Sequence, residues 1–110
     1  MDGYTLRFLV STAVVGASVT CFTALARADD MSIYQRNCGR CHDTGIAGAP
    51  KTGDVEAWKE RIAMGTDNLT RSVIDGMQGY SGVMPPRGGN PKLTDAQIRA
   101  AVEFIIMRSR

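Results

Sequence analysis

Residues 38–42 read Cys38-Gly39-Arg40-Cys41-His42, and this stretch decides how the rest of the chain is interpreted. A thioredoxin-like redox pair uses the same cysteine spacing but lies next to a β-α-β pattern, and none surrounds this motif. A structural zinc site needs four ligands, and no second pair of Cys or His residues follows these three. A disulfide between Cys38 and Cys41 would close a loop too small to stabilise a domain much.

The pattern Cys-x-x-Cys-His is instead typical of the attachment site of c-type haem. At this spacing, two thiols can add across the two vinyl groups of one porphyrin as thioethers, and the next residue presents its imidazole to the iron. We therefore expect Cys38 and Cys41 to hold one covalent haem c, and His42 to be the proximal iron ligand. Haem of this type is attached outside the cytoplasm, so the chain should carry an export signal.

The first 28 residues have the form of a secretory signal peptide. Arg7 precedes an uncharged run from Phe8 to Ala26, and Ala26-Arg27-Ala28 has the small-x-small pattern of a cleavage site. An uncleaved membrane anchor is the alternative, because the run is just long enough to span a bilayer. We expect residues 1–28 to be removed and residues 29–110 to form one monohaem domain in the periplasm, without membrane insertion.

The composition fits one small globular domain. The chain has 110 residues, of which 44% are hydrophobic, and 13 basic against 11 acidic residues give a net charge of +2. Such a balance argues against nucleic acid as a partner, because phosphate recognition needs clustered positive charge. Aromatic residues make up only 6% of the chain, so the core must be mostly aliphatic or be built around a group that is not an amino acid.

Local signals predict an all-α fold, with about four short helices wrapped around the haem. A first helix over 30–38 leads into the attachment motif. Asp54 is the expected N-cap of a second helix that ends near Gly65, and Thr66 or Asp67 is the expected N-cap of a third that ends near Gly76. The glycine-rich segments 43–54 and 76–91 are expected to be loops, because no segment alternates as a strand.

The last predicted helix has the clearest signals. Thr94 followed by Gln97 three residues later is a capping box. Apolar residues then recur at helical spacing and should form the buried stripe of this helix: Ile98, Ala101, Val102 and Ile105.

Methionine can be the second ligand of the haem iron, and His/Met ligation is typical of electron carriers. Met84 is the first choice because Pro85-Pro86 fixes the backbone beside it. Met77 lies in the same loop and stays an alternative. Of the others, Met64 and Met107 end predicted helices and are explained by core filling, and Met31 lies too near the start of the mature chain to reach the distal face easily.

Several motifs in order resemble the cytochrome c5 branch of class I c-type cytochromes. They are the attachment motif, GAPKTGD at 48–54, the pair Trp58 and Arg61, MPPRGG at 84–89, and a Thr-Asp start to the last helix. The resemblance covers nearly the whole mature chain, from about Tyr34 to Met107. It implies a small periplasmic electron carrier rather than an enzyme, with His42 and Met84 as the axial ligands of the haem iron.

The resemblance also implies roles for supporting residues. The Pro50 carbonyl would accept the second N–H of the ligating imidazole. Trp58 would pack near the haem edge or simply fill the core, and Arg61 would pair with a haem propionate or be a solvated helix charge. Tyr34 would pack against the terminal helix near Phe104 or Ala101.

Two other functions stay open. One is a haem subunit of a larger oxidoreductase complex. The other is a haem enzyme or gas-binding protein with an open iron site, although the chain has a single His and so lacks a distal acid–base histidine.

The expected partners of an electron carrier are redox proteins of the respiratory or periplasmic electron-transfer chain, contacted by a monomer or weak dimer. We expect a mostly apolar docking patch of small residues with a thin basic rim made by Arg40, Lys51 and Arg87.

Overall fold

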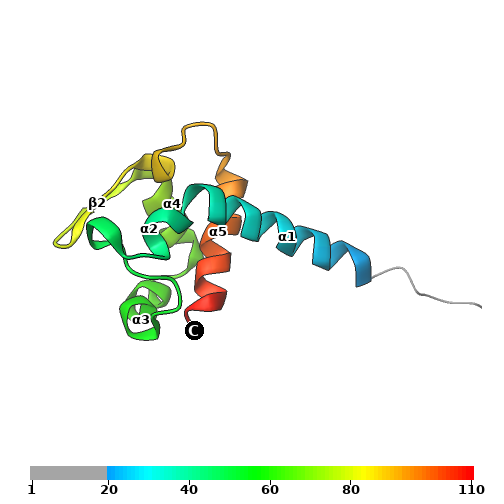
Figure 1. Cartoon of the computed structure of the whole chain (residues 1–110), viewed down its shortest axis with the longest axis horizontal. Helices are drawn as coiled ribbons and strands as arrows, with labels where there is room; N and C mark the ends of the chain where they lie inside the picture. The colour runs from blue at the N-terminus through cyan, green and yellow to red at the C-terminus, as the bar shows by residue number, and fades with distance from the viewer. Residues whose placement is uncertain (1–19) are drawn as a thin grey trace, which may run out of the picture.

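The structure, a computed structural model, describes residues 20–110, with side chains from residue 29 onward. Its helices and strands follow in the order α1 (Thr20–Asn37), α2 (Gly39–His42), α3 (Val55–Ala63), α4 (Thr66–Asp75), β1 (Met77–Gly79), β2 (Gly82–Met84) and α5 (Asp95–Arg108), with short 3₁₀ turns η1 (Ile46–Gly48) and η2 (Pro86–Gly89). Figure 1 shows the hairpin on the side of the molecule away from the start of α1. The mostly helical fold class is confirmed.

Helix α1 begins ten residues earlier than expected, at Thr20 instead of near Asp30. No Gly or Pro interrupts this stretch, so nothing in the local sequence ends the helix there. Figure 1 shows its first half projecting beyond the other helices. The predicted signal peptide lies outside the described residues as far as residue 19. Within residues 20–110, no helix is both long and apolar enough to cross a membrane.

Helix α5 is the centre of the core and separates two clusters of buried side chains. The predicted stripe is confirmed, and Ile106 extends it. The first cluster contains Tyr34, Cys38, Trp58, Ala101 and Ile105. The second contains Leu69, Leu93, Ile98, Val102 and Ile106. Because α5 presents residues to both clusters, it holds α1 and α3 on one side and α4 on the other.

Helix starts are set by local hydrogen bonds, and two of the three predicted caps are confirmed. The Asp54 side chain accepts from the Ala57 amide, and Thr94 and Gln97 form the complete capping box. The expected cap of α4, Thr66 or Asp67, was wrong by one or two residues, because Gly65 takes that position. The Gly65 amide donates to Ile62 and its carbonyl accepts from Leu69, so one glycine with positive φ ends α3 and starts α4.

The loop expected over 76–91 contains a small antiparallel hairpin instead. Strands β1 and β2 pair in the register Met77 to Met84, Gln78 to Val83 and Gly79 to Gly82. Strands of three residues are too short to show an alternating pattern, so this hairpin has no local signal in the sequence.

The hairpin packs closely on η1 through two glycines. A Cβ placed on Gly48 would lie 1.7 Å from the Ser81 carbonyl oxygen, and one placed on Gly82 would lie 2.1 Å from the Ala47 carbonyl oxygen. Both glycines also have positive φ, which other residues rarely adopt. The turn after the attachment motif and the strand that ends in Met84 are therefore in direct backbone contact.

Candidate functional site

The attachment motif forms a single helical turn at the end of α1. The Cys38 amide donates to Tyr34, and the His42 amide donates to Cys38. This turn places the two cysteines on one helix face, because residues three apart are neighbours. Cys38 is buried, Cys41 is half-buried, and they form no disulfide with each other. Burial, together with the neighbouring Cys41, raises the pKa of the Cys38 thiol to about 11.

His42 is buried, and its side chain makes one hydrogen bond. Its Nδ1 lies 2.8 Å from the Pro50 carbonyl oxygen. A carbonyl only accepts, so Nδ1 carries the proton and Nε2 keeps its lone pair for a metal ion. The His42 carbonyl in turn accepts from the Thr52 amide at 2.7 Å. The loop around residues 50–52 therefore fixes both the backbone and the ring of the histidine.

Trp58 belongs to the core and also lies beside the histidine. It is 6% exposed, its indole N–H donates to the Lys51 carbonyl at 2.8 Å, and its ring centroid lies 5.9 Å from that of His42. Arg61 lies outside this pair, with its guanidinium 6.0 Å from the Trp58 ring centroid and a donated bond to the Ala57 carbonyl. The cation thus stacks on the indole.

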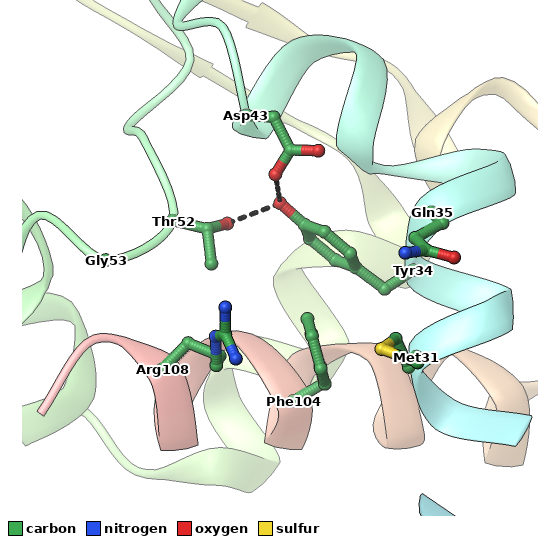
Figure 2. A pocket seen from close by; sticks show the side chains of 8 residues that line it. All are labelled: Met31, Tyr34, Gln35, Asp43, Thr52, Gly53, Phe104 and Arg108. Carbon is green, nitrogen blue, oxygen red and sulfur yellow. Dashed lines mark hydrogen bonds between the residues drawn. The ribbon is translucent and has the colours of Figure 1, made fainter. Parts of the chain in front are cut away.

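Tyr34 packs against Phe104, as expected, with ring centroids 4.8 Å apart. Figure 2 shows a feature that sequence reasoning missed: the Tyr34 hydroxyl lies between Asp43 and Thr52. It is 2.5 Å from Asp43 Oδ1 and 2.7 Å from Thr52 Oγ1. These contacts join α1 to Asp43, which directly follows His42, and to Thr52 in the loop that carries Pro50. Burial and the hydrogen bond to Asp43 raise the pKa of Tyr34 to about 12.

The two candidate methionines lie opposite each other in the hairpin. Met84 is half-buried, whereas Met77 is 48% exposed. After Met84 the chain passes through Pro85 and Pro86 into η2. There the Arg87 guanidinium donates to the Leu93 carbonyl at 2.8 Å and forms an ion pair with Asp95 at 2.7 Å. The loop that carries Met84 is therefore tied to the start of α5.

This arrangement fits a haem in its donor chemistry. Turn η1 contacts both α2 and β2, so the cysteines, the histidine and the Met84 strand adjoin the same short segment. Met77 exposes an apolar side chain on the same face of the hairpin as Met84, which suits the face of a porphyrin. Among the side chains of residues 29–110, no three His, Cys, Asp or Glu converge on a site for a bare metal ion.

Comparisons with known proteins agree with this chemistry. Residues 27–105 match the family described as "Cytochrome C oxidase, cbb3-type, subunit III". Cytochrome c-555 of Chlorobaculum tepidum is 43% identical over 104 residues, which are 92% of this chain and 96% of that protein. Cytochrome c5 of Ectopseudomonas mendocina is 38% identical over 78 residues, or 69% of this chain and 83% of that protein.

A solved structure gives the same result for the fold. The cytochrome c in a crystal structure titled as the electron transfer complex of nitrite reductase with cytochrome c superposes with a TM-score of 0.67. It is 39% identical in sequence, and the match covers 74% of this chain and 95% of that one. The chain therefore belongs to this cytochrome c family, as a small c5-like monohaem member of class I that carries electrons on a covalent haem c and is not an enzyme.

Proposed function

We propose that this carrier holds its haem through thioethers to Cys38 and Cys41, with His42 and Met84 as the two axial ligands of the iron. The observation that carries the proposal is the bond between His42 Nδ1 and the Pro50 carbonyl, at 2.8 Å. It leaves the other ring nitrogen of His42 available to a metal. His42 directly follows Cys41, the second of two cysteines at the attachment spacing. When bound, the haem supplies an iron that changes oxidation state by one electron.

The surrounding residues keep the site rigid. Pro50 holds the proton on Nδ1, which fixes the ring orientation and makes the imidazole a stronger donor. Trp58 covers the ring and anchors the same loop through the Lys51 carbonyl. Arg61 is oriented by Trp58 and Ala57, and we assign it to the edge of the haem pocket. A rigid site favours fast electron transfer, because little has to rearrange when the charge changes.

Met84 is favoured over Met77 by the way its loop is held. Gly76 packs against the Met84 carbonyl and against Pro86, since a Cβ at Gly76 would lie 3.0 Å and 2.8 Å from their nearest atoms. Arg87 ties the next turn to Asp95. With its backbone fixed on both sides, Met84 loses little further freedom on binding the iron, and this lowers the cost of ligation.

The cellular setting follows from the leader and the attachment motif. We propose that residues 1–28 are removed on export and that residues 29–110 work in the periplasm. Figure 1 shows the N-terminal part of α1 standing apart from the other helices, so cleavage after Ala28 would leave the core contacts of Tyr34 in place.

Redox proteins are the partners of such a carrier, and a relative is seen in a complex with nitrite reductase. We propose that the docking face of this chain is formed by η1 and the hairpin, where Ile46, Tyr80 and Val83 are exposed. Arg40 and Lys51 are exposed and can supply its basic rim. Arg87 is already bound to Asp95 and is left out of the rim.

The haem attachment can be tested directly. Protein matured in the periplasm should keep its haem on the polypeptide after acid-acetone extraction, and its intact mass should equal residues 29–110 plus one haem. A Cys38→Ala, Cys41→Ala double variant should release any haem it binds. Haem that is extractable from the native protein would overturn the proposal. Rapid carbon monoxide binding to the reduced native protein would show an open iron site instead.

A further inference from the structure

The Tyr34 hydroxyl connects the end of the attachment turn, at Asp43, to the loop that carries Pro50, at Thr52. Asp43 follows His42 directly in the chain, and Thr52 donates its amide to the His42 carbonyl. Figure 2 shows the hydroxyl between the side chains of these two residues, with Phe104 and Arg108 of α5 on the other side of the cavity. A phenol has one proton, so Tyr34 donates to the Asp43 carboxylate and accepts from the Thr52 hydroxyl.

We propose that Tyr34 is a positioning residue for the iron site: by joining Asp43 to Thr52, it holds the Pro50 carbonyl against the His42 ring. The inference rests on the proposed function, since it takes His42 as the proximal ligand. The loop that carries Pro50 is bound at neighbouring residues as well, through the Lys51 carbonyl to Trp58 and the Gly53 amide to Ser109. Neither of these contacts reaches the attachment turn, whereas Tyr34 bonds the turn and the loop together.

Gly39 in the attachment motif supports this assignment. The Asp43 side chain folds back over Gly39 to reach Tyr34, and a Cβ at Gly39 would lie 2.8 Å from Asp43 Oδ2. The φ of Gly39 is not positive, so the backbone itself does not require glycine there. An alanine at position 39 would therefore push the Asp43 carboxylate away from its place beside Tyr34.

Tyr34 would affect the iron through the donor strength of the His42 imidazole. A firm bond from Nδ1–H to a carbonyl makes the ring a better donor, which stabilises the ferric state. If the hydrogen bonds of Tyr34 to Asp43 and Thr52 are lost, the Nδ1 proton of His42 should exchange with water more often. The ferric state should then lose stability relative to the ferrous state. Both changes are measurable on the holoprotein without an electron-transfer partner.

The test compares Tyr34→Phe with the native holoprotein. Phenylalanine keeps the ring contact with Phe104 and removes only the hydroxyl, and the exposed Asp43 can turn to water, so the variant should fold. We expect exchange of the His42 Nδ1 proton, followed by NMR of the reduced protein, to accelerate about tenfold or more, the effect of losing a hydrogen bond to a charged group. The ratio of oxidised to reduced protein at a fixed ambient potential should fall a few-fold. Gly39→Ala, which displaces Asp43, should change both quantities in the same direction.

Thr70→Val is the matched control for a purely structural effect. Thr70 is 7% exposed, and its hydroxyl donates to the Thr66 carbonyl within α4. This contact does not involve Tyr34, Asp43 or Thr52. It should lower stability and leave both readouts unchanged. If Tyr34→Phe also leaves both unchanged in a protein with covalent haem and histidine ligation, the positioning role is wrong and the proposed function stands. If the native protein lacks that haem ligation, the proposed function fails and the inference fails with it.

Discussion

Met77 and Met84 are directly paired across the hairpin, so their side chains lie on the same face of the two-stranded ribbon. This pairing places the alternative ligand next to the favoured one. The two residues differ in their setting: Met84 is half-buried and followed by two prolines, whereas Met77 is 48% exposed and has no proline beside it. The rigidity of the backbone, and not position along the hairpin, distinguishes them.

Substitution of each methionine should therefore give different results. Met84→Ala should abolish the weak red absorption band of sulfur–iron ligation in the oxidised protein, lower the reduction potential and let carbon monoxide bind to the reduced protein. Met77→Ala should leave all three properties unchanged. Visible spectra and a redox titration of both holoproteins measure these properties. The reverse pattern would assign the ligand to Met77.

The backbone contact between η1 and the hairpin predicts a second effect on this ligand. Gly82→Ala should push the hairpin away from Ala47, because the new Cβ would lie 2.1 Å from that carbonyl oxygen. We expect a loss of about 1–3 kcal/mol of unfolding free energy, as for other overpacked sites, together with a weaker sulfur–iron band. Denaturant unfolding of the holoprotein and its spectrum give the two measurements.

Gly79→Ala is the control for the hairpin. Its φ is not positive, and the nearest atom to an added Cβ is 4.0 Å away. It should leave the spectrum unchanged and alter stability far less than Gly82→Ala. Equal effects of the two substitutions would mean that close contact with η1 does not hold the hairpin in place.

The chain's helical segments could be predicted because their signals are local. The capping residues lie within three residues of the groups they bind, as Asp54 does in α3 and Thr94 and Gln97 do in α5. The apolar residues of α5 repeat at helical spacing. The attachment motif is likewise five consecutive residues. The start of α1 was missed because the helix continues through the predicted cleavage point without any local stop signal.

The contacts that organise the site were not predictable in this way. Tyr34 and Thr52 are 18 residues apart, and the same sequence pattern is satisfied by a tyrosine that only packs. Gly48 and Gly82 lie in segments expected to be loops, and nothing local indicates their contact, because each glycine meets a segment far away in the chain. Arg87 was assigned to the rim, since nothing in the sequence indicates that Asp95 takes its charge.

The stability of the protein should fall as the pH rises above 10. Tyr34 has an ordinary pKa of 10.0, which applies to the unfolded chain, and a pKa of about 12 in the folded protein because of its burial and the Asp43 carboxylate. Between these values the unfolded state has lost the proton and the folded state keeps it, so rising pH favours unfolding. The contribution is complete below pH 10 and disappears as the pH passes the folded value. Urea unfolding across this range measures it.

Tyr34→Phe should remove this part of the loss of stability at alkaline pH, because the variant has no phenol to titrate. Arg108 and Asp43 still line the cavity in the variant, as they do in the native protein. Tyr80→Phe is the control, because Tyr80 is fully exposed at the tip of the hairpin, and it should keep the native decline. A Tyr34→Phe variant that loses stability with pH as steeply as the native protein would show that another group causes the decline.

The basic rim predicts how electron transfer with an acidic redox partner depends on salt. Lys51→Gln and Arg40→Gln each remove an exposed charge beside the proposed docking face, so each should lower the second-order rate constant at low salt. Arg87→Gln should change it less, because the charge of Arg87 is already paired with Asp95 at 2.7 Å.

The native rate constant should fall only a few-fold from low to physiological salt, where the Debye length is roughly 8 Å. Stopped-flow oxidation across ionic strength measures all four proteins. A native rate that rises with salt, or an effect of Arg87→Gln as large as that of Lys51→Gln, would contradict this docking face.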